Sequence, residues 1–226
     1  LVGRSGPNTA AAASAVAEIQ AHGCVVVVEK ADVSSVEDMK RVVDKANEVP
    51  AAPLVGVIHA AGVIRDGAVS SLQWADFDAV AKPKMAGAWN LHTLTASCPL
   101  DFFVLFSSLA SVTGNVGQAN YAAANAFLDS LAAHRQTKGL PGLSINWGPW
   151  AAVGMAAELS TAGVAPEKLM PEDGLEQLDL LLATGGQAQA IVAPLADFVA
   201  EFPASAVPPM LSGLVSSGAT GSGSAN

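Results

Sequence analysis

The 226-residue sequence is poor in charge, and above all in basic residues. Charged side chains make up 14% of the chain and hydrophobic ones 51%, so it can bury a large core and is not disordered as a whole. It has 11 basic and 20 acidic residues, a net charge of −9, and the basic ones are scattered. Nucleic acids and anionic membranes are bound through clustered lysine and arginine, so neither is expected as the main partner.

Cysteines and long apolar runs are scarce as well. The two cysteines, Cys24 and Cys98, are far apart and lack the spacing of metal ligands. We expect both to be reduced thiols in the core of a cytoplasmic protein, and we expect no metal site. No apolar run approaches the ~20 residues that a membrane span needs, and no signal peptide is recognisable.

What the sequence has instead is a series of short apolar runs that alternate with helical stretches. We expect buried parallel strands at 25–32, 53–62, 102–108, 142–148 and 189–194, and the end of another at 1–4. Helices are expected at 8–22, 35–47, 76–97, 119–137 and 171–182. Strands that alternate with helices predict an α/β fold with a doubly wound parallel sheet.

The composition changes at about Pro203. Residues 203–226 lose hydrophobic periodicity and are rich in proline, serine and glycine, which is typical of a linker. A chain of this length suits one α/β domain better than two. We therefore expect a folded domain at residues 1–202 and a flexible interdomain linker at residues 203–226.

Aromatic residues are also rare, and the single tyrosine, Tyr121, lies in an unusual stretch, FSSLASVTGNVGQANYAAANAFLD, at residues 106–129. Two serines, Ser107 and Ser108, stand upstream of it at the end of an expected strand, and Asn125 follows four residues later. A tyrosine alone is more often a core residue than a catalytic one. Its neighbours in the sequence therefore decide how it is interpreted.

Five blocks of the sequence, in order and with consistent spacing, resemble the ketoreductase domains of modular polyketide synthases, which belong to the short-chain dehydrogenase/reductase superfamily. They are VIHAAGV (57–63), KPKMAGAWNLH (82–92), FVLFSSLAS (103–111), NYAAANAFLD (120–129) and INWGPWAAVGM (145–155). The resemblance covers nearly the whole expected domain. It implies a Rossmann-type sheet and NADPH-dependent reduction of a β-ketoacyl thioester to the β-hydroxyacyl thioester, on an acyl carrier protein and among other polyketide synthase domains.

The resemblance also implies roles for four residues. Hydride delivery to a ketone leaves negative charge on oxygen, which needs a proton. Tyr121 is the implied acid, and Ser108 is implied to bond the same carbonyl oxygen. A phenol has an unperturbed pKa of about 10, and a nearby ammonium favours its ionised form and makes it a better donor. Ordinary short-chain dehydrogenases place that lysine where Asn125 stands, whereas the polyketide ketoreductases resemble this chain in having it upstream, at Lys84.

Alternatives remain for two of these positions. Ser107 competes with Ser108, and Lys82 competes with Lys84; the spacing of the family favours Ser108 and Lys84. Either lysine taken alone reads as a solvated surface charge. His59, at the end of its expected strand, is interpreted as structural rather than as an acid or base.

The cofactor site is implied less completely. Arg4 would meet the 2′-phosphate of NADPH, because a guanidinium matches phosphate oxygens in a bidentate way, and Ser5 would assist. Asp32 and Val33 resemble the turn that contacts adenine. Three small residues after an expected strand allow the chain to pass close to the cofactor ribose: Ala60, Ala61 and Gly62.

The family's glycine-rich pyrophosphate turn has no counterpart in this sequence, which contains no GxGxxG. The opening LVGRSGP resembles the second strand of the family and the loop after it. We therefore expect the sequence to be an N-terminally truncated ketoreductase that lacks its first strand and glycine-rich turn. On its own it is not expected to bind cofactor or to be active.

Substrate and stereochemistry depend on two further segments. In the loop that resembles the family's Leu-Asp-Asp motif the chain has Ile64, Arg65 and Asp66, and Thr113 stands where the other stereochemical class has tryptophan. This pattern favours the B-type class, which sets a D-configured hydroxyl. The segment WGPWAAVGM resembles the loop and lid helix over the substrate, with the wall residues Trp147, Pro149, Trp150 and Met155.

Two other functions remain open. A non-catalytic, ketoreductase-like scaffold in a megasynthase would share the fold. A free-standing short-chain dehydrogenase acting on a small alcohol would share the chemistry. The set of Tyr121, Ser108, Lys84 and Asn125 argues against the scaffold, and the exchange of lysine and asparagine argues against the free-standing enzyme.

Overall fold

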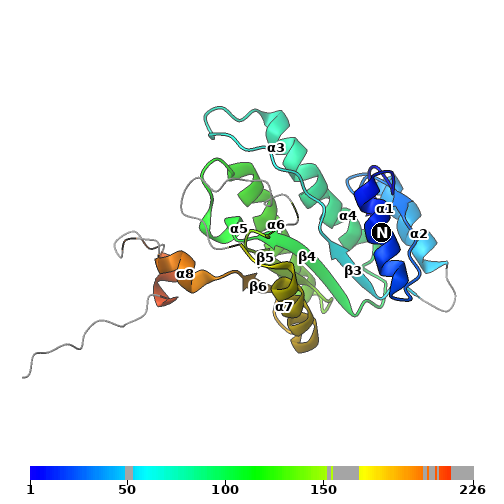
Figure 1. Ribbon diagram of the computed structural model, residues 1–226. Helices are drawn as coiled ribbons and strands as arrows, with labels where there is room; N and C mark the ends of the chain where they lie inside the picture. The colour runs from blue at the N-terminus through cyan, green and yellow to red at the C-terminus, as the bar shows by residue number, and fades with distance from the viewer. Residues whose placement is uncertain are drawn as a thin grey trace, which may run out of the picture. The chain divides into compact units, whose positions relative to one another are not determined.

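The computed structural model describes residues 1–48, 53–151, 154, 168–200, 203, 207 and 209–214. The chain divides into two compact units, Leu1–Asn146 with Gly186–Ala190, and Trp147–Gly185 with Ile191–Asn226. The first unit carries the helices α1 (Ala10–Ala21), α2 (Val36–Asn47), α3 (Trp74–Ala81), α4 (Gly87–Leu94), α5 (Ala110–Thr113) and α6 (Ala119–Thr137) (Figure 1). The second carries α7 (Pro171–Thr184), α8 (Leu195–Ala200) and a 3₁₀ helix, η3 (Pro209–Leu214).

The strands form two sheets. One has the order β3 (Gly56–His59), β4 (Phe102–Ser108), β5 (Leu143–Trp147), β6 (Gln189–Val192), and the other pairs β1 (Val2–Gly3) with β2 (Glu29–Lys30). The pairs β1–β2 and β3–β4 are both parallel, with Gly56 opposite Phe102 and His59 opposite Leu105. The predicted α/β fold with a parallel sheet is confirmed.

The prediction for residues 25–32 was too long. Only Glu29–Lys30 are paired, and Val25 and Val27 are 94% and 53% exposed instead of buried. The register explains this, because Leu1 N donates to Val27 O and Glu29 N donates to Leu1 O, so no residue of β1 lies opposite Val25. The neighbouring Cys24 is exposed and Cys98 half-buried, which corrects the expectation of two core thiols.

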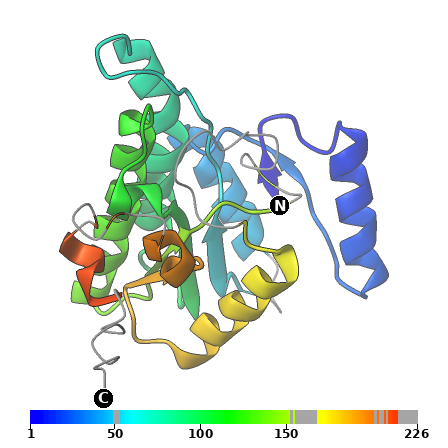
Figure 2. The ribbon, with the colours of Figure 1, turned by 60° about the vertical axis from the view of Figure 1, so that its left-hand side comes forward.

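The core of the first unit lies between α6 and β4. Phe103 and Leu105 on β4 pack with Leu128 and Leu131 on α6, and all four are buried. Views in Figures 1 and 2 show α6 running along the strands, beside the segment that contains α3 and α4. Near its end α6 carries the fully buried Arg135, whose guanidinium lies 3.7 Å from the centre of the Phe103 ring. Helix α6 was predicted with its exact bounds, residues 119–137.

The helix expected at 76–97 is continuous but not uniform. Between α3 and α4 it contains a π-helical turn, η1 (Lys82–Ala86), with Pro83 in its first turn. Proline has no N–H and its ring crowds the preceding turn, so a wider turn is the usual accommodation inside a helix. π-Turns add one residue per turn and shift every following side chain around the helix axis.

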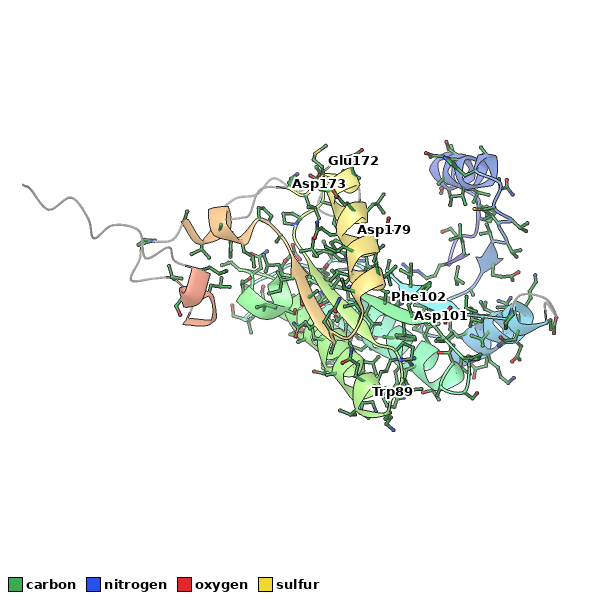
Figure 3. All side chains as sticks on the ribbon, turned by 90° about the horizontal axis from the view of Figure 1, so that it is seen from below. Trp89, Asp101, Phe102, Glu172, Asp173 and Asp179 are labelled. Atoms are coloured by element: carbon green, nitrogen blue, oxygen red, sulfur yellow. The ribbon has the colours of Figure 1, made fainter. Side chains whose placement is uncertain are left out.

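The second unit was predicted in part. Helix α7 begins at Pro171 as expected and has Glu172 and Asp173 in its first turn; both project from the helix together with Asp179 (Figure 3). Within the expected linker, residues 209–214 form η3, whose Leu211 is buried against Phe198 and Val199. The linker role of residues 203–226 otherwise stays a prediction. In the part of the chain that the structure describes, none of the helices is long and apolar enough to cross a membrane.

Gly87 lies where the loop after β2 packs closely against the helix, so a substitution at Gly87 tests this contact. A Cβ on Gly87 would lie 2.8 Å from Val33 Cγ1 and 3.3 Å from His59 Cε1. Helix propensity alone favours alanine over glycine by about 1 kcal/mol. We nevertheless expect Gly87→Ala to lower the free energy of unfolding by about 1 to 3 kcal/mol, measured by urea denaturation, because the stiff Val33 side chain cannot yield. A stabilised variant would contradict the close contact.

Candidate active site

The π-turn turns one lysine inward and leaves the other outside. Lys84 is 3% exposed, and its Nζ donates a 2.8 Å hydrogen bond to the carbonyl of Phe106 on β4. Its Nζ also lies 5.5 Å from the centre of the Tyr121 ring. Lys82 instead points to solvent and pairs with Asp78 on its own helix at 2.6 Å. Of the two lysines that the sequence left open, the geometry therefore favours Lys84.

Burial makes the Lys84 ammonium costly. It lowers the pKa of Lys84 from 10.5 to about 8, and the carboxylate of Asp129 acts in the opposite direction. Lys84 is therefore mostly cationic at neutral pH but close to titration. A buried lysine with a lowered pKa is typical of functional sites, because burying a cation lowers the stability of the fold.

His59 lies against the same turn. Hydrogen bonding to the backbone of Pro83 and Lys84 favours its protonated form, but burial and the Lys84 charge dominate and lower the pKa of His59 to about 4. The imidazole is therefore neutral at physiological pH, and its Nε2 has no hydrogen-bond partner among the described residues. The structural role of His59 stays a prediction.

Tyr121 is placed near the start of α6. Its backbone N–H donates to Asn120 Oδ1 at 2.8 Å, and the Asn120 amide donates to the carbonyl of Arg65 at 2.8 Å. Burial raises the pKa of Tyr121, the Ser108 and Asn125 side chains oppose this by hydrogen bonding, and Asp66 adds to it. The net upward direction differs from the lowering expected from a nearby ammonium. In this state of the chain the phenol is a protonated donor at neutral pH.

The two serines of β4 face different groups. Ser107 Oγ is buried; it donates to the backbone carbonyl of Asn125 at 3.2 Å and accepts from Asn146 Nδ2 at 3.2 Å. Ser108 Oγ accepts a hydrogen bond from Ala110 N at 3.2 Å. Hydrogen bonding by the Ser108 side chain also works against the rise in the pKa of Tyr121. Because successive side chains alternate across a strand, only Ser108 faces Tyr121. The geometry favours the serine that the family spacing selects.

Asn125 is fully buried one turn after Tyr121. Its Nδ2 donates to the Tyr121 backbone carbonyl at 2.8 Å, while its Oδ1 has no partner among the described residues. A buried acceptor without a partner is unusual and indicates a position for water or ligand. The structure thus brings Tyr121, Ser108, Lys84 and Asn125 together in the first unit.

The expected cofactor residues gather at the ends of β1 and β2. Arg4 and Ser5 are exposed in the turn after β1. The pKa of Asp32 is lowered, first by hydrogen bonds from Ser34 and then by the charges of Arg4 and Lys82. Val33 is held by Asn90, whose amide donates to its carbonyl at 3.0 Å. After β3, Ala60 is exposed while Ala61 and Gly62 are half-buried.

The loop that carries Asp66 is fixed to the loop before Tyr121. Gln118 Nε2 donates to both carboxylate oxygens of Asp66, at 3.0 and 3.1 Å, and Gly67 N donates to Gly117 O at 2.8 Å. Sequence reasoning missed Gln118 and Asn120 as partners of this loop. Their only signal was polarity just before the tyrosine, which does not identify a partner 52 or 55 residues away.

The expected substrate-wall residues belong to the second unit. The rings of Trp147 and Trp150 lie 4.8 Å apart, and Trp147 is 4% exposed. A Cβ on Gly174 of α7 would come within 2.4 Å of the Trp150 ring, so Trp150 packs directly on that helix. The carbonyl of Pro149 accepts from Leu169 N at 2.7 Å. Met155 lies outside the described residues.

Within the described ranges, no group of three or more histidine, cysteine or acidic residues is placed to hold a metal ion. The acid and cation of the site are side chains of the chain itself, namely a phenol and a buried ammonium. Such a pair can donate one proton and stabilise the anion that is left.

Comparisons with known proteins agree with one another. Residues 1–152 match the model of the KR domain family. The chain is 42% identical over 95% of its length to polyketide synthase GfsB of Streptomyces halstedii, and 40% identical over 95% to the phenolphthiocerol synthesis polyketide synthase type I Pks15/1 of Mycobacterium marinum. It spans only 4% and 11% of the length of these two relatives.

Solved structures give the same result. A structure described as A-type ketoreductases from modular polyketide synthase superposes with a TM-score of 0.85 and 35% identity, covering 96% of this chain and 47% of the other. The first ketoreductase of the tylosin synthase superposes with a TM-score of 0.76 and 35% identity, covering 88% and 44%.

The buried charge of Lys84 predicts a stability effect with a defined pH dependence. Unfolding returns its pKa from about 8 to about 10.5, so the unfolded chain binds more protons between these values and stability rises with pH across that window. Below it the charge costs about 3 kcal/mol, at ~1.4 kcal/mol per pKa unit. We expect Lys84→Met to be more stable than wild type at pH 7 and to lose most of that advantage by pH 10.5, in urea denaturation followed by tryptophan fluorescence.

Lys82→Met is the matched control, because its charge is exposed. We expect it to change stability little and without this pH dependence. A Lys84→Met variant that is less stable than wild type at pH 7 would show that the buried ammonium stabilises the fold.

Proposed function

This chain belongs to the ketoreductase domains of modular polyketide synthases, oxidoreductases of the short-chain dehydrogenase/reductase type, and we propose that it reduces a carrier-protein-bound β-ketoacyl thioester to the β-hydroxyacyl thioester with NADPH. Family membership implies β-keto reduction in polyketide synthesis, a nicotinamide cofactor and other synthase domains as neighbours. NADPH, the carrier protein and the roles of single residues are what the proposal adds. The observation that carries it is the protonated Tyr121 phenol beside the buried Lys84 ammonium.

In the proposed mechanism the phenol of Tyr121 gives its proton to the β-carbonyl oxygen, and the Ser108 hydroxyl donates a hydrogen bond to the same oxygen. A nicotinamide cofactor, when bound, supplies the hydride. Proton transfer leaves a phenolate, and the Lys84 ammonium stabilises that anion in a site where burial has removed water. The charge on Lys84 is thus needed after the transfer more than before it.

Asn125 completes the proposed set. Its amide NH₂ donates to the Tyr121 carbonyl, and its Oδ1, which no described residue contacts by a hydrogen bond, is available to a water that can resupply the phenolate with a proton. The exchange of lysine and asparagine thus keeps a cation and an amide at the tyrosine but moves the cation onto the π-turn. This is the feature of the site that separates it from ordinary short-chain dehydrogenases in the family pattern.

NADPH is favoured over NADH by the charge at the expected 2′ position. Arg4 is exposed, and its charge, like that of Lys82, helps to lower the pKa of Asp32. Two cations fit a phosphate better than a free ribose hydroxyl, which a carboxylate usually binds. Ser5 is proposed to assist, and Asp32 and Val33 to line the adenine side.

Three further parts of the proposal rest on the sequence pattern. Asp66, held by Gln118, is proposed to help set the D-configured hydroxyl of the B-type class. Trp147, Pro149, Trp150 and Met155 are proposed to form part of the substrate wall. The cytoplasmic location stays a prediction from the cysteine content.

Tyr121→Phe tests the proposed acid. The ring packs as before but the proton donor is lost, so turnover of a β-ketoacyl thioester should fall by about 10² or more. Cofactor affinity should change little. The assay uses the polypeptide as its gene encodes it, with NADPH oxidation followed at 340 nm. Near-normal turnover would remove Tyr121 from the mechanism.

Arg4→Ala tests the choice of cofactor. If the guanidinium binds the 2′-phosphate, the variant should lose about 1.5 to 3 kcal/mol of NADPH affinity, the range for a charge-assisted hydrogen bond, and far less NADH affinity. Lys40→Ala is the control, because it removes an exposed cation on α2. Equal losses for both cofactors in Arg4→Ala would make Arg4 a structural residue.

A further inference from the structure

The carboxylate of Asp129 is the centre of a hydrogen-bond network that connects α6, α5, β5 and the end of strand β4. Asp129 on α6 accepts hydrogen bonds from neutral donors only: Ser144 Oγ at 2.6 Å and Asn146 Nδ2 at 3.1 Å to Oδ1, and Ser111 Oγ at 2.7 Å and Asn146 Nδ2 at 3.0 Å to Oδ2. Ser144 and Asn146 belong to β5, and Ser111 to α5. All of these residues lie in the first unit.

The orientation of Asn146 is fixed from the other side. Gln189 at the start of β6 donates from Nε2 to Asn146 Oδ1 at 2.8 Å. The NH₂ group of Asn146 must therefore face Asp129, because the carbonyl of the same amide is already engaged. Its two hydrogens are shared among several oxygens, which is common in crowded polar sites.

The oxygens that share those hydrogens belong to the two serines of the active-site stretch. Asn146 Nδ2 lies 3.2 Å from Ser107 Oγ and 3.3 Å from the carbonyl of Ser108, and Ser111 Oγ lies 2.9 Å from that carbonyl. Asn146 therefore connects the Ser108 peptide to Asp129, while the single hydroxyl hydrogen of Ser111 is given either to the Ser108 carbonyl or to Asp129. Tyr121 and Asn125 belong to the same helix as Asp129, two turns and one turn earlier respectively.

The network also bears on the charge of Lys84. Asp129 accepts four hydrogen-bond contacts from three neutral donor groups, and its carboxylate favours the ammonium form of Lys84. The other titratable groups beside Lys84 are His59, which is neutral, and Tyr121, which is protonated. Asp129 is therefore the one anion known to act on Lys84 among the described residues.

We propose that Asp129 is a positioning residue of the reductase: through Asn146 and Ser111, its carboxylate holds the Ser107–Ser108 end of β4 against α6. This inference rests on the proposed function. Asparagine cannot replace it, because an amide at this position would direct an NH₂ group at the donors of Ser111, Ser144 or Asn146. A half-satisfied polar network is worse than an apolar one, so the end of β4 would shift.

Asp129→Asn is the direct test, assayed in the polypeptide as its gene encodes it. We expect kcat to fall at least tenfold at pH 7 while the Kd for cofactor changes less than twofold. Reduction needs the Lys84 ammonium, so the rate falls as pH rises through the pKa of Lys84. Without the Asp129 charge this upper limit should move to lower pH by at least half a pH unit.

Two variants separate geometry from charge. Ser144→Ala removes one donor to Asp129 but no charge, so it should lower kcat without moving the pH limit. Asp101→Asn removes an exposed carboxylate at the amino end of β4, labelled in Figure 3, and should change neither quantity. Wild-type kcat and an unmoved pH limit in Asp129→Asn would overturn the inference, as would a folding defect in Asp129→Asn combined with wild-type kcat in Ser144→Ala.

A failure of the proposed function would be seen differently. Wild-type protein that reduces no β-ketoacyl thioester contradicts the function but leaves the network open to test by the titration of Lys84 itself. Lysine labelled with ¹³C at Cε should then show a lower midpoint for Lys84 in Asp129→Asn than in wild type. An unchanged midpoint would overturn the electrostatic part of the inference.

Discussion

The buried ammonium of Lys84 is the constraint on which the rest of the site depends. A lysine that is 3% exposed, with its pKa lowered to about 8, is held at a cost to the fold. Three interactions favour the buried ammonium and offset part of that cost: the hydrogen bond to the Phe106 carbonyl, the Tyr121 ring at 5.5 Å and the charge of Asp129. Such an arrangement is expected where a cation serves a reaction, because a hydrophobic side chain would serve the core better.

The backbone around Lys84 is organised to make this possible. The π-turn at Lys82–Ala86 directs Lys84 inward while Lys82, two residues earlier, pairs with Asp78 in solvent. A neutral His59 lies against the turn, and Gly87 lets the loop after β2 approach the same helix. The carboxylate of Asp129 on α6 is bonded to β5 and α5, and Asn146 of β5 continues the network to Ser107 and Ser108 on β4. Tyr121, Lys84 and Ser108 are therefore carried by three elements, α6, the π-turn and β4, that meet at this end of the strand.

The sequence predicted most of the fold but only part of the site. Strand β4 and helix α6 were found with their exact bounds, because β4 is a short, uninterrupted apolar run and α6 is a long alanine-rich stretch with Gly117 before it and Gly139 after it. Val25 and Cys24 were misjudged, since hydrophobicity alone does not show that a strand lacks a partner. Lys84 could be separated from Lys82 only by family spacing, because a π-turn leaves no trace in a 3.6-residue pattern. Asp129, Asn146 and Gln189 are brought together by the topology of the sheet, which pairs positions up to 43 residues apart.

The most direct test of the account is the titration of Lys84 itself. The chain with lysine labelled by ¹³C at Cε can be followed by NMR from pH 6 to pH 12, with Lys84→Met to assign the resonance. The account predicts one lysine signal, absent from the variant, with a midpoint near pH 8, well below the ordinary lysine value of about 10.4. A midpoint for Lys84 at that ordinary value would mean that its ammonium is solvated, and the account of a buried cation beside Tyr121 would be wrong.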